Sequence, residues 1–243
     1  MKIHKYTINN SELFKMPSEE RLIFYYIGIM LHEIFMLHKI TLCSASSNEI
    51  EEKIGCITVQ QIYFVCLLAG KLNECNVFIS KKFFGNGLAK FYDNTAFLGN
   101  EGKNAINEIK KYFKNDNLIT NTRKKFSFHY DPDYIAKTIE DNLLELNFDM
   151  YLSDFQGTCF YKGLSLIFIE SLFSSINKVD QASAIKQYFE EIESISKSFI
   201  AFFNSLIIGL AKKYFNINEF IPETFEVDSP KYSDIRIPFF LTN

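Results

Sequence analysis

Residues 185–210 read IKQYFEEIESISKSFIAFFNSLIIGL, and this stretch decides the fold class. Large apolar side chains recur in it three or four residues apart, the spacing that places them on one face of an α-helix. The pattern is sustained for about seven turns and predicts a long helix over 179–214. The stripe consists of Ile185, Tyr188, Phe189, Ile192, Ile195, Phe199, Phe202, Phe203, Leu206 and Leu210.

Helical patterns also occur outside this stretch. Apolar residues with the same spacing predict further helices over 18–39, 59–82, 104–113, 132–146 and 159–176. Pro17 with Glu19 and Glu20 suits the start of the first one, and Asp131 followed by Pro132 suits the start of the fourth. The helix over 18–39 is apolar on nearly all sides, so we expect it to be deeply buried.

Composition places the chain among globular all-α proteins. It has 243 residues, of which 47% are hydrophobic, and only 10 Gly and 5 Pro. Such scarcity of turn residues disfavours an all-β protein. No repeat, low-complexity tract or linker is visible, so we expect a single helical domain over 1–243. It should consist of a bundle of five to six helices over 18–214 and an extended C-terminal tail over 215–243.

The cysteines and the apolar runs bear on location. Five cysteines are present, an odd number without any C-x-x-C pair, which is typical of reduced thiols in a cytosolic protein. The N-terminus has no continuous apolar segment of the secretory kind. The longest apolar run, 199–211, is interrupted by polar residues and is shorter than the roughly 20 residues that cross a bilayer. We therefore expect a cytoplasmic protein without a membrane partner.

A basic, aromatic segment, NTRKKFSFHYDPD at 121–133, is the strongest candidate for chemistry. It sets Arg123 five intervening residues before His129. The planar guanidinium of Arg matches two phosphate oxygens, and His accepts or donates a proton near neutral pH. The alternative role for His129 is structural: a ring that packs on Phe126 and caps nearby backbone groups.

Positive charge is concentrated around this segment. Residues 103–125 contain seven cationic side chains against Glu108 and Asp116, a local charge of +5, whereas the rest of the chain carries −8. An anionic ligand held at one place fits this distribution. A solvated, lysine-rich helix face is the other explanation. The cationic side chains are Lys103, Lys110, Lys111, Lys114, Arg123, Lys124 and Lys125.

The string Arg123-Lys-Lys-Phe-Ser-Phe-His-Tyr-Asp131 resembles the Arg-x(4-6)-His motif of HEPN domains, which are all-α modules found in many prokaryotic toxins and phage-defence ribonucleases. Leu68-Ala-Gly-Lys71-Leu-x-Glu74 and the long last helix with its Ile-Pro-Phe tail are similar to uncharacterised bacterial HEPN-like proteins. The likeness covers residues 18–214.

The resemblance implies a metal-independent endoribonuclease that needs no cofactor. In the family, Arg and His of two subunits meet at a dimer interface, and the 2′-hydroxyl of RNA attacks the adjacent phosphate. Here His129 would move the hydroxyl proton and Arg123 would stabilise the charge on the phosphorane. The expected RNA contacts are Lys114, Asn121, Lys124 and Lys125. A homodimer and an antitoxin protein are the implied partners.

One position departs from the family pattern. Lys124 stands directly after the Arg, where active members usually carry a small polar residue such as Asn. Lys cannot accept a hydrogen bond, and Asn121 is the nearest amide that could replace the missing one. Two functions therefore stay open: a defence or toxin ribonuclease, and a catalytically inactive helical module that binds RNA, a nucleotide or a protein. For metal binding, the first helix carries His32, Glu33 and His38 but no His-Glu-x-x-His set, so no metal site is expected.

Overall fold

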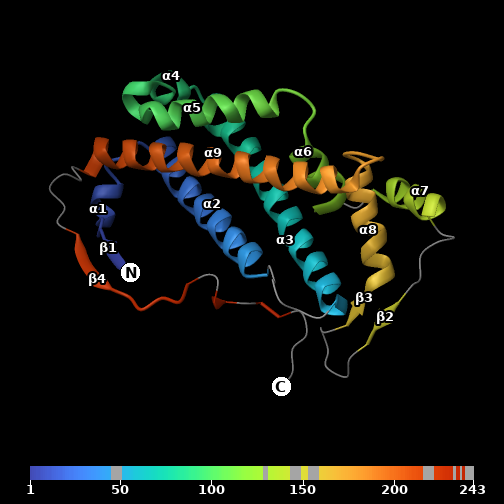
Figure 1. Ribbon diagram of the computed structural model, residues 1–243. Helices are drawn as coiled ribbons and strands as arrows, with labels where there is room; N and C mark the ends of the chain where they lie inside the picture. The colour runs from blue at the N-terminus through green and yellow to red at the C-terminus, as the bar shows by residue number, and fades with distance from the viewer. Residues whose placement is uncertain are drawn as a thin grey trace. The chain divides into compact units, whose positions relative to one another are not determined.

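The computed structural model confirms that the protein is all-α, with little sheet (Figure 1). It describes residues 1–44, 51–127, 131–142, 149–152, 159–215, 222–231, 234–235 and 237–238. The helices are α1 (Asn10–Leu13), α2 (Ser18–Cys43), α3 (Glu51–Phe78), α4 (Ala89–Tyr92), α5 (Thr95–Phe113), α6 (Leu118–Thr122), α7 (Pro132–Asn142), α8 (Lys162–Ser174) and α9 (Gln181–Phe215). Two π-helical segments are η1 (Ile79–Phe84) and η2 (Arg123–Ser127).

The six helices expected from the sequence are all present, with shifted ends. Helices α2 and α7 begin at the expected residues, and α9 covers the long stripe almost from end to end. Helix α3 begins eight residues earlier than 59, and α5 begins at Thr95, nine residues earlier than 104. A kink at Gly99, whose φ of 70° is in the left-handed region, divides α5. Its first turn is therefore a separate short helix that the pattern over 104–113 did not reveal.

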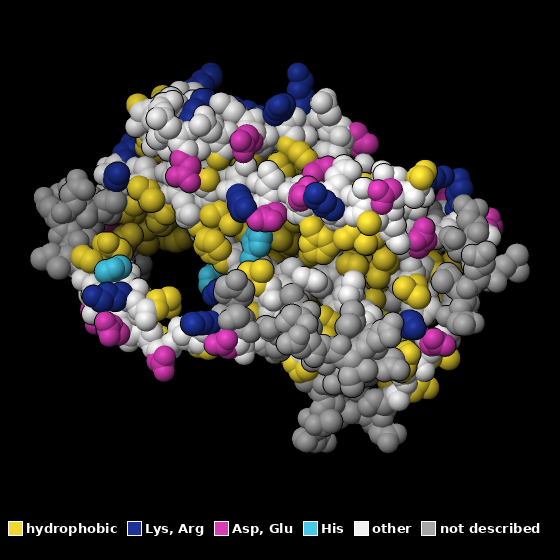
Figure 2. Space-filling model, in the orientation of Figure 1, with side chains coloured by type: hydrophobic (Ala, Val, Ile, Leu, Met, Phe, Trp, Pro, Cys, Tyr) yellow, Lys and Arg dark blue, Asp and Glu magenta, His cyan; other side chains and the backbone are white. Residues whose placement is uncertain are grey.

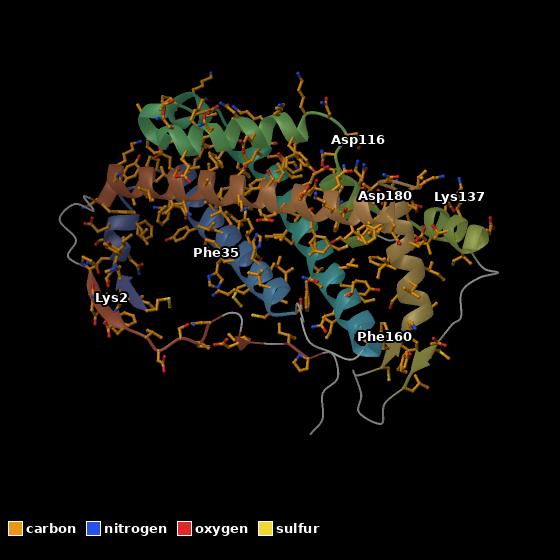
Figure 3. All side chains as sticks on the ribbon, viewed as in Figure 1. Lys2, Phe35, Asp116, Lys137, Phe160 and Asp180 are labelled. Atoms are coloured by element: carbon orange, nitrogen blue, oxygen red, sulfur yellow. The ribbon has the colours of Figure 1, made fainter. Side chains whose placement is uncertain are left out.

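Within the described residues, four short strands are present that were not expected from the sequence. Strand β1 (Lys2–Lys5) pairs antiparallel with β4 (Glu223–Glu226), with Ile3 opposite Phe225. Figure 1 shows β1 and β4 side by side. Part of the tail is thus a strand and not merely an extended segment along the helices. Strand β2 (Met150–Tyr151) pairs antiparallel with β3 (Phe160–Tyr161), where Figure 3 labels Phe160.

The chain divides into two compact units. Unit 1 consists of Met1–Phe35, Glu74–Asn115 and Ile195–Lys231, and unit 2 of Met36–Asn73, Asp116–Ser194 and Tyr232–Asn243. Helices α2, α3 and α9 each contribute residues to both units. Whether the two units form a single domain over 1–243, as expected from the sequence, depends on how they join. The single domain therefore stays a prediction.

The core of unit 1 forms around the C-terminal half of α9. Phe199, Phe202, Phe203, Leu206 and Leu210 are all almost completely buried there. Helix α5 crosses α9 closely, because Gly102 faces the side chain of Ser205, where any larger residue would collide. The ring of Phe97 occupies the space above Gly209 in the same way. Two glycines, one on each helix, therefore set the α5–α9 packing.

Helix α2 corrects one expectation. It was expected to be deeply buried, yet Leu22, Tyr25, Tyr26 and Ile29 are 40%, 47%, 45% and 55% exposed. They share one side of the helix, while Ile23, Ile27, Met30, Leu31 and Ile34 on the other side are buried. The helix is apolar on nearly all sides because it has two apolar faces, and the core of unit 1 covers one of them.

The core of unit 2 joins α3, α8 and the N-terminal half of α9. Its buried residues include Ile62 and Val65 of α3, Leu172 and Phe173 of α8, and Tyr188 of α9. The ring of Phe173 meets that of Tyr188 edge to face at 5.7 Å. Of the ten stripe positions on α9, eight are buried across the two units, and Ile185 and Phe189 are half-buried.

Three of the described helical stretches are long and apolar enough to cross a membrane by length and composition. They are Ser18–Cys43, Gly55–Phe84 and Gln181–Phe215. The apolar run at 199–211 was expected to be too short to cross a membrane. The whole helix around it, Gln181–Phe215, is nevertheless long and apolar enough to do so. In the most apolar segment of Gln181–Phe215, 50% is buried inside the protein, so packing explains much of the high hydropathy of this helix.

Candidate functional site

The candidate site begins on a helix that changes type at Arg123. Asn117 caps α6, since its side-chain oxygen accepts a 2.9 Å hydrogen bond from the backbone N–H of Thr120. The chain then continues as the π-helical segment η2 from Arg123 to Ser127. Such π-helical turns are frequent at functional sites. Positions 128–130 lie outside the described residues, so the placement of His129 stays a prediction.

Buried side chains hold this segment in unit 2. Ile119, Thr122 and Phe126 are almost fully buried, at the spacing that puts them on one face. The ring of Phe126 meets Phe168 of α8 edge to face at 5.9 Å, and Phe168 in turn stacks on Tyr63 of α3 at 4.8 Å. The buried ring of Phe126 is therefore structural, and it fixes the backbone three residues after Arg123.

Two hydrogen bonds tie the same segment to α3. The Thr120 hydroxyl donates to the Asn73 side-chain oxygen at 3.0 Å, and the Ser127 hydroxyl donates to the Cys66 carbonyl oxygen at 2.7 Å. Cys66 and Asn73 are seven residues apart on one helix, so they lie about two turns apart on the same face. Helix α3 thus supports the segment both before and after Arg123.

The predicted phosphate-binding side chains differ in exposure. Arg123 is half-buried at the edge of the packed face, Lys124 is exposed, and Lys125 is half-buried. The Asn121 amide donates a 3.2 Å hydrogen bond to the carboxylate of Asp116, which Figure 3 labels in the turn before α6. Asn121 therefore has a partner other than the Arg, which weakens its expected role as a substitute amide.

The basic residues expected over 103–125 fall on both units. Lys103, Lys110, Lys111 and Lys114 belong to unit 1, whereas the cations at 123–125 belong to unit 2. Lys103 and Lys110 both bind the carboxylate of Asp93, at 2.7 and 2.5 Å. Asp93 lies ten residues before Lys103, so it falls outside the segment 103–125, whose charge is +5.

Asp93 is firmly ionised. Burial raises the pKa of its carboxyl, but the hydrogen bonds and charges of Lys103 and Lys110 lower it more, so the pKa lies below its usual range. The local charge of +5 therefore overstates the positive charge of the lysines on unit 1, because it leaves out Asp93. Lys114, one of the predicted RNA contacts, is exposed on unit 1.

Cys66 is no nucleophile, although it lies beside the candidate site. Its thiol is buried 3.2 Å from the hydroxyl of Tyr188, and burial raises the pKa of the thiol to about 12. A thiol with so high a pKa is almost entirely protonated at neutral pH. All five cysteines are free thiols, as the sequence predicted.

Unit 1 contains a polar cluster that the sequence did not reveal. The Lys213 ammonium donates a hydrogen bond to the Tyr92 hydroxyl at 2.5 Å and lies 3.4 Å from the Glu20 carboxylate. The Glu20 carboxylate also accepts a 2.7 Å hydrogen bond from the Tyr214 hydroxyl. Three helices, α2, α4 and α9, supply these groups. Burial raises the pKa of Tyr92 to about 12. Each group has a partner inside the cluster, which makes it a structural connection between helices and not a reactive site.

Within the described ranges, no group of three or more His, Cys, Asp or Glu side chains is arranged to hold a metal ion. No family model, curated protein or solved structure matches the chain.

Proposed function

We propose that the protein is a HEPN-like, metal-independent endoribonuclease that cleaves RNA with Arg123 and His129. The observation that supports this proposal is the fixed position of Arg123. It opens a π-helical turn that is packed through Phe126 and hydrogen-bonded to α3 through Thr120 and Ser127. A catalytic group must be held in place by its surroundings, and this segment meets that condition. The all-α fold agrees with the family, whose motif occupies a helical setting.

The proposed reaction needs a base and a stabiliser of negative charge. His129 removes the proton of a 2′-hydroxyl, and the oxygen attacks the adjacent phosphorus. The bond to the 5′-oxygen then breaks, and this oxygen takes up a proton from water. Arg123 binds the equatorial oxygens of the phosphorane, where negative charge builds up. The products are a 2′,3′-cyclic phosphate and a 5′-hydroxyl end, and DNA is not a substrate because it lacks the 2′-hydroxyl.

A catalytically inactive HEPN-like module is the second candidate function. Lys124 favours it, because this exposed ammonium stands where an amide is usual and has no acceptor atom to offer. Such a module would bind RNA, a nucleotide or a protein partner through the same segment without cleaving RNA.

A homodimer belongs to the proposal, and α2 offers a surface for it. The exposed side chains of Leu22, Tyr25, Tyr26 and Ile29 form a contiguous apolar face on unit 1. An open depression of about 410 Å³, lined by Phe24, Tyr25, Gly28, Ile29, His32 and Glu33, lies along it. A second copy of the same face would remove these side chains from water.

The remaining partners follow from the same proposal. His32 and Glu33 interrupt the apolar run of α2, and ionisable groups in lipid are costly, so we propose that α2 meets protein and not a bilayer. Five free thiols fit a reducing compartment, which favours the cytoplasm. An antitoxin protein that covers the Arg123 segment would keep such a ribonuclease inactive.

Cleavage of a labelled, unstructured RNA by the purified protein tests the function. Arg123→Ala and His129→Ala should each reduce the rate by about 10²- to 10⁴-fold, with little change in melting temperature. Lys137→Ala is the matched control, because Lys137 is an exposed cation on α7 (Figure 3). Excess chelator should leave the rate unchanged, and the product should carry a cyclic phosphate. A His129→Ala protein with near-wild-type cleavage rules out the mechanism.

A further inference from the structure

Unit 1 carries a basic face that, apart from Lys114, the proposed ribonuclease site does not use. Between positions 78 and 114 the chain has seven lysines against three acidic residues, a net charge of +4, while the rest of the chain sums to −7. Figure 2 shows Lys and Arg side chains gathered over α4 and α5. The lysines are Lys81 and Lys82 of η1, Lys90 of α4, Lys103, Lys110 and Lys111 of α5, and Lys114, the C-cap residue of α5.

The lysines of α5 form a line along the helix. Lys103, Lys110 and Lys114 are seven and four residues apart, so they fall on one side, and Lys111 flanks them. Glu101 and Glu108 lie about 150° around the helix from that line, as the 3.6-residue turn requires. The Glu108 carboxylate accepts a hydrogen bond from Ser198 of α9 and so faces the neighbouring helix. The acidic groups of α5 are therefore kept away from its basic line.

Lys110 connects this line to the other two basic segments. Its ammonium lies 4.3 Å from the centre of the Phe84 ring, at the end of η1, and it pairs with Asp93, which directly follows α4. The three elements that carry the seven lysines thus meet at one side chain. Asp93 offsets Lys103 and Lys110, while Lys81, Lys82, Lys90, Lys111 and Lys114 are exposed.

An exposed aromatic ring lies on the same short helix as Lys90. Phe91 is 70% exposed, next to Lys90, because its neighbours Leu88 and Tyr92 take the buried side of α4. Asn94 fixes the following turn: its amide donates to the Phe91 carbonyl oxygen at 2.8 Å, and its side-chain oxygen accepts from the Phe97 N–H at 2.9 Å. An exposed ring next to Lys90, on a short helix that meets two other basic segments at Lys110, combines the two features that bind single-stranded nucleic acid.

We propose that this face binds single-stranded RNA. The lysines contact phosphates, and Phe91 stacks on an unpaired base. Duplex RNA offers the same phosphates but no free base for Phe91, so it should bind more weakly. The choice of RNA over single-stranded DNA rests on the proposed ribonuclease function, whereas the charges and the ring are independent of it.

Fluorescence anisotropy with a labelled 20-nucleotide RNA lacking secondary structure tests the proposal. The background is the full-length Arg123→Ala chain, which prevents cleavage during the measurement. Lys111→Glu with Lys114→Glu should weaken binding at least tenfold and lower the slope of log K against log salt by more than about 1, since each lost phosphate contact contributes about 0.7 for a single strand. Phe91→Ala should weaken binding about tenfold without changing that slope.

A matched control separates the face from general charge. Lys2→Glu with Lys186→Glu removes the same net charge from exposed lysines on β1 and α9 and should leave the affinity within about twofold, since neither would contact a phosphate. The proposal fails if the two double variants bind equally well, or if Phe91→Ala has no effect and duplex RNA binds as tightly as the single strand. It also fails, without harm to the ribonuclease proposal, if cleavage needs Arg123 but the face variants bind as wild type. If the face variants lose RNA binding while the Arg123→Ala chain still cleaves RNA, the basic face is supported as a binding site. The catalytic role of Arg123 is then refuted.

Discussion

The hydroxyl of Ser127 donates a 2.7 Å hydrogen bond to the backbone carbonyl oxygen of Cys66, across 61 residues of sequence. The acceptor lies inside α3, one of the long helices of the fold, and its thiol side is closed by Tyr188. Together with the buried ring of Phe126, this bond fixes the end of η2, the point from which the chain leads to His129. Ser127 is therefore a positioning residue for the proposed site and does not itself touch the phosphate in the proposed reaction.

Replacing Ser127 with Ala should reduce both stability and cleavage. Loss of the hydrogen bond should lower the free energy of unfolding by about 1 kcal/mol, measured by urea denaturation. Cleavage should fall further than the folded fraction does, because the turn that carries Arg123 loosens. Ser175→Ala is the control, since Ser175 donates a 2.6 Å bond to the Leu172 carbonyl oxygen at the end of α8. A Ser127→Ala protein that cleaves at the wild-type rate contradicts the positioning role.

The sequence was sufficient for helix positions but not for what covers each helix. Periodicity is a local property of the backbone, so the stripe on α9 and the start of α7 at Pro132 could be predicted. The exposed face of α2 could not be, because an apolar pattern does not specify which neighbour buries it. The β1–β4 pair joins residues more than 200 positions apart, and short strands of such separation leave no local pattern.

The same reasoning explains which parts of the site were found. Arg123 and its lysines stand together in the sequence and were visible as a motif. The partners of the segment, Cys66 and Asn73, depend on how α3 packs against it, and no spacing reveals that. Asp93 was missed because charge was counted along the sequence, whereas the kinked start of α5 brings it to Lys103 and Lys110.

Gly102→Ala should destabilise the protein, because an added methyl group meets Ser205 of α9. Overpacking of this kind costs about 1–3 kcal/mol, which urea denaturation should detect. Gly55→Ala is the matched control: Gly55 lies in α3 with open space on its Cβ side, and Ala is the better helix former, so stability should rise slightly. Equal effects of the two changes contradict a close α5–α9 crossing at Gly102.

Ile29→Asp should prevent the proposed homodimer. Ile29 is the most exposed apolar residue in the face made by Leu22, Tyr25, Tyr26 and Ile29, and a carboxylate there would be buried without a partner in the interface. Light scattering should give a dimer mass for the wild type and a monomer mass for the variant. Ile208→Asp is the control: Ile208 is an exposed apolar residue of α9 outside the α2 face, so this variant should stay dimeric. If the wild-type protein is monomeric at micromolar concentration, the proposed homodimer is wrong, and so is an active site shared between two subunits.

Stability should fall at alkaline pH because of Tyr92 and Lys213. Burial raises the pKa of Tyr92 to about 12, and although burial lowers the pKa of Lys213, its hydrogen bonds to Tyr214 and Tyr92 and the charge of Glu20 raise it overall. From about pH 10 upward, the unfolded chain releases these protons while the folded protein retains them, so unfolding becomes more favourable as pH rises. The urea midpoint should decrease between pH 8 and pH 11. The decrease should be smaller in Tyr92→Phe, but not in Tyr6→Phe, whose ring is exposed. Equal pH dependence in all three proteins contradicts the role of Tyr92.

Lys124→Asn separates the two candidate functions. Lys124 is exposed and follows Arg123 directly, so the change should leave the free energy of unfolding, measured by urea denaturation, within about 0.5 kcal/mol of wild type. An amide at this position can accept as well as donate a hydrogen bond and adds no charge beside the guanidinium. If the wild type is a ribonuclease, the variant should cleave the labelled RNA at least as fast, and Arg123→Ala should abolish cleavage in both backgrounds. If the wild type cleaves no RNA and Lys124→Asn does, the chain is an inactive HEPN-like module in which Lys124 blocks catalysis. Cleavage that persists in Lys124→Asn with Arg123→Ala would mean that the activity arises elsewhere, and both functions assigned to the Arg123 segment would be wrong.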